Sequence, residues 1–107
     1  MEMKELLDFI DLENQRLIQR FGNSSSQTER ILSRTVKLTE ELGELCDEVL
    51  AYNKDQRQEK LDQNDGSNLA HEFADVIITT LLLAKSMDVD IQEALKNKIV
   101  KINLRYK

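Results

Sequence analysis

The sequence predicts an all-α protein, a four-helix bundle that forms a single domain over residues 1–107. The chain of 107 residues contains no proline and only three glycines, so few turns are expected. Leu, Ile, Glu, Lys and Gln are frequent, whereas aromatic residues make up 5%. Apolar residues also recur at intervals of three and four, which is the period of an amphipathic helix.

The first half of the chain predicts two long helices. The first runs over residues 2–20 and ends at Gly22, a residue that commonly follows a helix C-terminus. Polar residues 23–26 supply an N-cap for a second helix over residues 27–53. Residues 54–68 hold one strong hydrophobe among charges and amides, which predicts a mobile connection. The inner stripe of the second helix is expected at Ile31, Leu38, Leu42, Leu45 and Val49.

The second half predicts two further helices. The third, over residues 69–87, is apolar around most of its circumference and must be surrounded. Three neighbouring helices would hardly cover it, so a homodimer with this helix at its centre is predicted. Asp90, with Glu93 three residues later, resembles a capping box that starts a fourth helix over residues 91–105. Its inward side is expected to consist of Ile91, Leu95, Ile99 and Ile102.

Composition narrows the classes of function. The net charge is −5 and no basic face is evident, so nucleic-acid binding is not expected. Cys46 is the only cysteine, which excludes an internal disulfide and predicts a small buried hydrophobe. The longest uncharged run, residues 76–84, is too short to cross a membrane. The first residues lack the charge pattern of a signal peptide, so a cytoplasmic location is expected.

Two acidic pairs share one spacing. Glu41 with Glu44, and Glu72 with Asp75, are each separated by three residues, which places each pair on one helix face. If the two helices pack side by side, the four carboxylates meet and repel one another unless they are protonated or bridged by cations. Such oxygen ligands suit Mg²⁺ or Mn²⁺. The alternative is a solvated helix face, which is weaker for Asp75 because its neighbours in the sequence are apolar.

Three other features have competing interpretations. A di-iron carboxylate site would need two Glu-x-x-His motifs, and the single histidine, His71, is expected at the surface. Gly43, inside a predicted helix, indicates that another helix packs closely against it.

A cationic row near the C-terminus has two interpretations. Its side chains either lie along the apolar stripe with their charges in water, or they bind the outer phosphates of a nucleotide. Beside this row, Asn103 could contact a base or sugar, or simply pack. The row consists of Lys98, Lys101 and Arg105.

The acidic segments resemble a known signature. Glu40-Glu41-Leu42-Gly43-Glu44, followed by Glu72-Phe73-Ala74-Asp75, is similar to the EExxE…ExxD motif of the MazG-like all-α nucleotide pyrophosphohydrolases. The resemblance extends from Ile31 to Arg105. It implies a helical homodimer or dimer of dimers that hydrolyses a (deoxy)nucleoside triphosphate to the monophosphate and pyrophosphate with Mg²⁺.

The resemblance also implies residue roles. The metal ligands would be Glu41, Glu44, Glu72 and Asp75. Glu40 would support the ligands or orient the attacking water, whose proton a free oxygen of Glu40, Glu41 or Glu44 could accept. The tail residues Lys98, Lys101, Asn103 and Arg105 are similar to a segment that contacts phosphate and sugar.

Two functional classes therefore follow from the sequence. The first is an enzyme that removes unwanted nucleotides from the cellular pool. The second is a non-catalytic dimeric adaptor or regulatory module that keeps the fold. The presence of all four implied ligands favours the enzyme.

Overall fold

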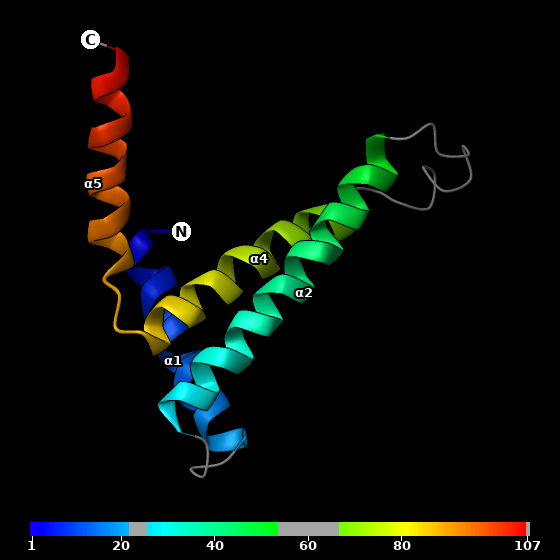
Figure 1. Cartoon of the computed structure of the whole chain (residues 1–107), viewed down its shortest axis with the longest axis vertical. Coiled ribbons are helices and arrows are strands. Elements are labelled where there is room, and N and C mark those ends of the chain that lie inside the picture. The colour runs from blue at the N-terminus through cyan, green and yellow to red at the C-terminus, as the bar shows by residue number, and fades with distance from the viewer. Residues whose placement is uncertain (22–25, 54–66, 107) are drawn as a thin grey trace.

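The computed structural model describes residues 1–21, 26–53 and 67–106, and within these ranges it contains helices and no strand (Figure 1). The predicted all-α fold is confirmed, and the helices begin and end within about two residues of the expected positions. Of the predicted connection over residues 54–68, residues 54–66 lie outside the described residues, and the last two residues belong to the following helix. The elements are α1 (Met3–Phe21), α2 (Gln27–Asn53), α4 (Ser67–Ser86), α5 (Ile91–Asn103) and the short 3₁₀ helix η1 (Leu104–Tyr106).

Hydrogen bonds to backbone N–H groups define the helix ends. Ser26 Oγ accepts from the N–H of Glu29, and the Asp90 carboxylate accepts from the N–H of Glu93, both at 3.1 Å. Both predicted N-caps are therefore confirmed. The C-terminus of α4 is closed by Asp88, which has a positive φ of 55°. The Val89 N–H donates to the carbonyl of Ala84, an arrangement that usually uses glycine at the left-handed position.

The core of the chain is small. α2 and α4 lie side by side, and α1 packs against the C-terminal half of α4 (Figure 1). Ile10 of α1 meets Leu81 and Leu82 of α4 to form the buried cluster. Around it pack the partly buried side chains of Leu6, Leu17, Ile78 and Ile91. This cluster joins α1 to α4.

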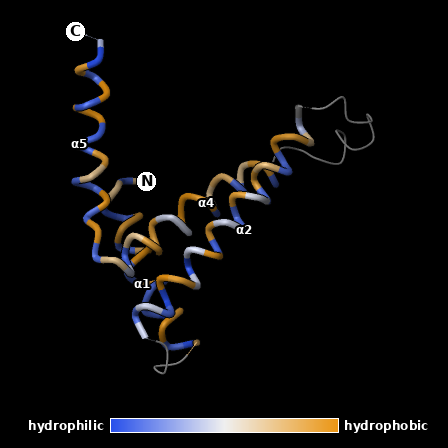
Figure 2. Tube along the Cα trace, viewed as in Figure 1, coloured by the Kyte–Doolittle hydropathy of each residue, from blue (hydrophilic) through white to orange (hydrophobic). Residues whose placement is uncertain are grey.

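α5 extends away from the other helices, so the molecule has two arms in a V (Figure 1). No residue of α5 is buried, and hydrophobic positions continue along it as they do along the other arm (Figure 2). Leu95, Ile99 and Ile102 are 43, 57 and 37% exposed. Their predicted inward position is therefore wrong for a single chain. The radius of gyration is 17.2 Å, whereas a compact domain of this length has about 13 Å.

Several local predictions also need correction. Leu42, expected on the inner stripe, is 48% exposed, whereas the neighbouring Glu41 is only 7% exposed. Cys46 is an exposed free thiol rather than a buried hydrophobe. A Cβ added to Gly43 would meet no atom within 4 Å, so close packing within the chain does not explain this glycine. His71 is exposed, as predicted. Within the described ranges, none of the helices has the length and apolar character needed to cross a membrane.

Candidate metal centre and adjoining pocket

Carboxylates from α2 and α4 meet between the paired helices. One carboxylate oxygen from each of Glu41, Glu72 and Asp75 lies within 4.8 Å of the other two. Glu72 and Asp75 lie one turn apart on α4 and face Glu41 on α2 because these two helices run side by side. Three of the four residues expected as metal ligands are therefore brought together by the packing of one chain.

Two oxygens of this cluster have no hydrogen-bond partner. Glu41 Oε1 lies 3.1 Å from the ammonium of Lys37, but Glu41 Oε2 and Glu72 Oε2 are buried without a partner. Buried carboxylate oxygens are costly to leave unpaired, because they have lost water without gaining a donor. A divalent cation would supply the missing charge and coordination, so the donor set and its burial fit a hard metal ion.

Further acidic residues near these three carboxylates act on them electrostatically. Burial raises the pKa of Glu72, and the negative charges of Glu44, Asp75, Glu41 and Glu48 raise it further. Glu44 is exposed and lies outside the closest group, yet its charge acts on Glu72. Glu40 is also exposed, and its Oε2 lies 3.8 Å from Lys37 Nζ. The close cluster therefore has Glu40 and Glu44 along its rim.

The cationic row expected to bind phosphates lies elsewhere. Lys98 and Lys101 are exposed on α5, Asn103 ends this helix, and Arg105 follows in η1. Because α5 forms the separate arm, a single chain does not bring these residues to the carboxylates (Figure 1). Their role in binding phosphate or sugar remains a prediction.

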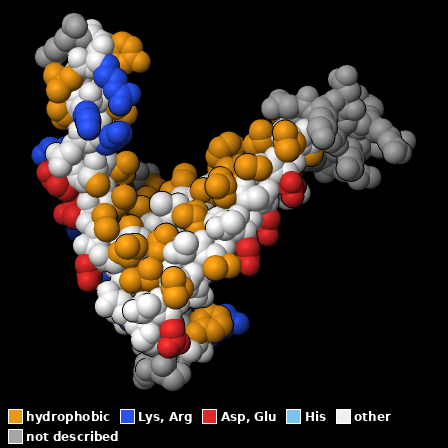
Figure 3. Space-filling view, viewed as in Figure 1, with side chains coloured by type: hydrophobic (Ala, Val, Ile, Leu, Met, Phe, Trp, Pro, Cys, Tyr) orange, Lys and Arg blue, Asp and Glu red, His pale blue; other side chains and the backbone are white. Residues whose placement is uncertain are grey.

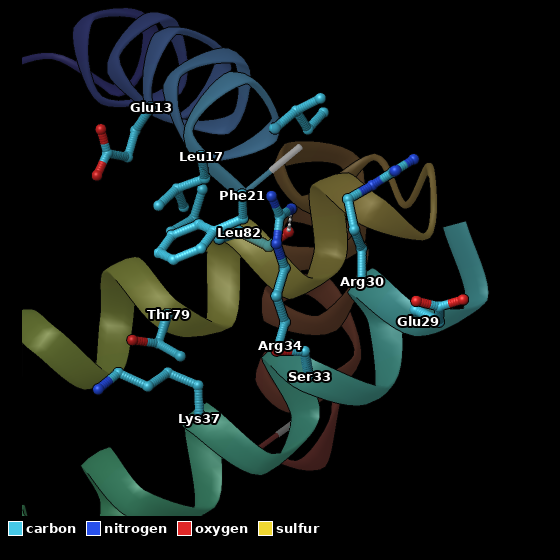
Figure 4. Close-up of a pocket in the computed structure, with 11 residues that line it drawn as sticks. Glu13, Leu17, Phe21, Glu29, Arg30, Ser33, Arg34, Lys37, Thr79 and Leu82 are labelled. Carbon is cyan, nitrogen blue, oxygen red and sulfur yellow. Dashed lines mark hydrogen bonds between the residues drawn. The ribbon is translucent and has the colours of Figure 1, made fainter. Parts of the chain in front are cut away.

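A pocket of about 730 Å³ lies beside the carboxylate cluster, and Figure 4 shows the residues that line it. Lys37, which pairs with Glu41, is also part of the pocket wall. α2 contributes cations together with Glu29 and Ser33, and the apolar residues of α1 and α4 lie beside Glu13 and Thr79. The lining residues that carry these properties are Arg30, Arg34, Lys37, Leu17, Phe21 and Leu82.

Arg34 is the central polar group of this pocket. Its Nη1 donates a 2.9 Å hydrogen bond to the carbonyl of Leu82, as Figure 4 shows. Burial lowers the pKa of Arg34, and the positive charge of Arg30 lowers it further. This pocket was not predicted from the sequence. The signal was that Lys37 and Arg34 lie one and two turns before Glu41, respectively, on the same helix face.

Comparison with known proteins identifies the family. Residues 29–107 match the MazG nucleotide pyrophosphohydrolase domain. The chain is also similar to a protein of Bacillus subtilis (strain 168) named "Uncharacterized protein YpjD", with 36% identity over 76 residues. This match covers 71% of the chain and 67% of the relative. No solved structure gives a significant match. The matched region includes all the clustered carboxylates, and the chain belongs to the MazG nucleotide pyrophosphohydrolase domain family.

Proposed function

We propose that this chain hydrolyses a ribo- or deoxyribonucleoside triphosphate to the monophosphate and pyrophosphate in a Mg²⁺-dependent reaction. The observation that carries the proposal is the convergence of Glu41, Glu72 and Asp75, with two buried oxygens that lack a partner. A triphosphate binds to an acidic protein only if cations lie between the two sets of negative charges. The cellular role would be the removal of unwanted nucleotides.

The clustered residues would hold the metal. Glu41, Glu72 and Asp75 would be ligands, and Glu44 would join them from the next turn of α2. Bound Mg²⁺, or Mn²⁺ in its place, would offset the charge of the triphosphate and lower the pKa of water. Lys37 holds one oxygen of Glu41 at 3.1 Å and thereby fixes the orientation of this carboxylate.

The products define the bond that breaks. The α–β bridge is the one cleaved, and we place the attack of water at the α-phosphorus: a new phosphorus–oxygen bond forms there, and the bond from this phosphorus to the bridging oxygen breaks. Pyrophosphate leaves with the electron pair of that bond. A carboxylate oxygen of Glu40, Glu41 or Glu44 would accept the proton of the attacking water, because these groups border the cluster.

The proposed active form is a homodimer. Hydrophobic side chains gather along the inner side of the α2–α4 arm and at the base of the V, and on the α5 arm they lie among Lys and Arg side chains (Figure 3). Phe73 and Ile77 on α4 are 49 and 53% exposed, and the apolar residues of α5 are similarly open. Covering such surface contributes about 25 cal/mol per Å², which favours a second copy across the V.

Charge complementarity supports the same assembly. Residues 91–106 contain four cations, Lys96, Lys98, Lys101 and Arg105, and one acidic residue, Glu93, whereas the paired helices α2 and α4 carry the acidic cluster. In the dimer, α5 of one copy would lie beside the carboxylates of the other. Lys98, Lys101 and Arg105 would then bind the outer phosphates, and Asn103 would contact the sugar or base.

A substrate panel tests this function. Pyrophosphate release is measured from each ribo- and deoxyribonucleoside triphosphate with Mg²⁺, with Mn²⁺ and with EDTA. We expect metal-dependent release that Asp75→Asn abolishes while the dimer persists. Asp47→Asn is the matched control because Asp47 is an exposed carboxylate on the same pair of helices. Full activity in Asp75→Asn would contradict the site. Absence of release from every nucleotide would favour the non-catalytic module.

A further inference from the structure

We infer that the pocket between α1, α2 and α4 binds the nucleoside part of the substrate, and that Arg34 hydrogen-bonds to its base. The inference rests on the proposed function because it takes the position of the phosphates from the carboxylate cluster. Its own evidence is the position, the lining and the polar geometry of the pocket (Figure 4).

The position of the pocket fits a group attached to the α-phosphate. With a rise of about 1.5 Å per residue, Lys37 lies roughly 6 Å and Arg34 roughly 10 Å along α2 from Glu41. Lys37 contacts both the cluster, through Glu41, and the pocket. A phosphate held at the carboxylates would therefore place its neighbouring substituent beside Lys37 and then Arg34.

The residues that line the pocket indicate which of the two groups attached to the α-phosphate it binds. One is the nucleoside and the other is pyrophosphate. Pyrophosphate would require cations on several sides, but α1 contributes Leu17, Ile18 and Phe21 together with the acidic Glu13, and α4 contributes Leu82. A second acidic residue, Glu29 of α2, also lines the pocket and disfavours a free anion there. The apolar side, with one aromatic ring, suits the flat face of a base. The volume of about 730 Å³ also lies within the usual range of small-molecule pockets.

Arg34 has the geometry of a residue that recognises a base. Its bond to the Leu82 carbonyl occupies one of five N–H donors and fixes the guanidinium beside Phe21 and Leu17 (Figure 4). No carboxylate of the described residues lies within 4 Å of Arg34. Its remaining donors can therefore bind acceptors of a ligand, and burial strengthens such bonds.

Two ligands separate nucleoside binding from phosphate binding. The dissociation constant is measured by calorimetry with Mg²⁺ for an α,β-methylene triphosphate analogue of the best nucleotide in the panel, and for inorganic tripolyphosphate. Arg34→Met should weaken binding of the analogue about tenfold or more, the loss expected for hydrogen bonds from a charged donor. Its effect on tripolyphosphate should stay below about twofold.

A second variant tests the inference independently of whether Arg34→Met folds. Phe21 is 67% exposed, so Phe21→Ala should fold normally. It should weaken binding of the analogue by about fivefold or more, as expected from lost stacking on a base, and should leave tripolyphosphate binding unchanged. Lys4→Met is the charge-matched control, because Lys4 is exposed on α1 and pairs with Asp8. It should change neither affinity.

The outcomes also separate the two proposals. Selective loss of the analogue in both variants supports the inference. Equal losses for both ligands, or no loss for either, would overturn it while hydrolysis by the unmodified protein continued. If the unmodified protein neither bound Mg²⁺-tripolyphosphate nor released pyrophosphate, the proposed function itself would fail.

Discussion

α4 and α5 follow one another in the chain and both are rich in apolar residues, but only α4 is packed. α4 buries Leu81 and Leu82 against α1 and lies along α2, whereas every residue of α5 after Ile91 is exposed. The comparison shows which part of the site a single chain assembles and which part it leaves exposed. The acidic cluster is assembled by the packed pair, and the cationic row lies on the exposed part of the C-terminal arm after Ile91.

This separation has a consequence for the site. The carboxylates of Glu41, Glu72 and Asp75 are already within 4.8 Å of one another in a single copy. In the proposed dimer, α5 of the second copy would bring Lys98 and Lys101 to these carboxylates. We therefore expect metal binding to depend on the fold of the monomer, and full phosphate binding to depend on the dimer.

The largest effect is expected from the packed pair. Glu72→Gln should reduce the rate of pyrophosphate release by at least about 10³-fold, because several kcal/mol of charge stabilisation would be lost at tenfold per 1.4 kcal/mol. Lys101→Ala on α5 should have a smaller effect and should act mainly through KM. The measurement is steady-state kinetics with the best substrate. A larger loss in Lys101→Ala than in Glu72→Gln would reverse the comparison.

The second effect concerns the exposed apolar side of α5. Ile99→Glu should convert the dimer to a monomer, because a charge placed in an apolar interface must be desolvated. Sedimentation measures the mass, and circular dichroism checks that the helices persist. Gln92→Glu on the same helix adds the same charge and should leave the dimer intact. A wild-type chain that sediments as a monomer at tens of micromolar would refute the predicted assembly.

A third, smaller effect is a dependence on pH. Burial and neighbouring charges raise the pKa of Glu72, so the folded chain retains this proton where the unfolded chain has released it. Without metal, this contribution to stability is present at low pH and is lost as the pH rises through the folded pKa. Glu72→Gln should therefore raise the Tm of the metal-free protein at about pH 7, but not at about pH 4.

Thermal melting across this pH range in EDTA measures that effect. Glu93→Gln is the control because Glu93 is an exposed acid on α5. Mg²⁺ should raise the Tm of the wild-type protein at neutral pH and have little effect on Glu72→Gln. An equal response of both proteins to Mg²⁺ would place the metal elsewhere.

The smallest effect is expected at the start of α5. Asp90→Ala removes the hydrogen bond to the Glu93 N–H and should cost about 1 kcal/mol. Asp90→Asn keeps an acceptor and should cost less. Urea unfolding measures both. If the cost vanished in the monomeric Ile99→Glu background, α5 would depend on the second copy for its own folding.

Local features of the fold were predictable from the sequence. The caps at Ser26 and Asp90 depend on side chains next to the helix they begin, so short-range pattern was sufficient. The meeting of Glu41 with Glu72 and Asp75 was foreseen from their shared spacing and the pairing of two helices. Their assignment as ligands remains a prediction.

Features that depend on tertiary placement were not predictable. The spacing of apolar residues along α5 identifies its apolar side. It does not indicate whether this side packs against the same chain or against another one. The buried side of α2 is turned slightly from the predicted one, so that Glu41 is buried and Leu42 exposed while Leu45 stays buried. Periodicity with a few apolar residues does not resolve such a small shift. The pocket beside Arg34 also needs α1, and nothing in the motif itself indicates how that helix crosses α4.

The closure of α4 at Asp88 gives the C-terminal arm the properties of a lever. Residues 91–106 extend for roughly 24 Å as helix, and a turn of only a few residues joins them to α4. A rotation of about 10° at this joint would displace Arg105 by about 4 Å. A small change in the backbone at one aspartate could therefore move a guanidinium by more than the length of a hydrogen bond.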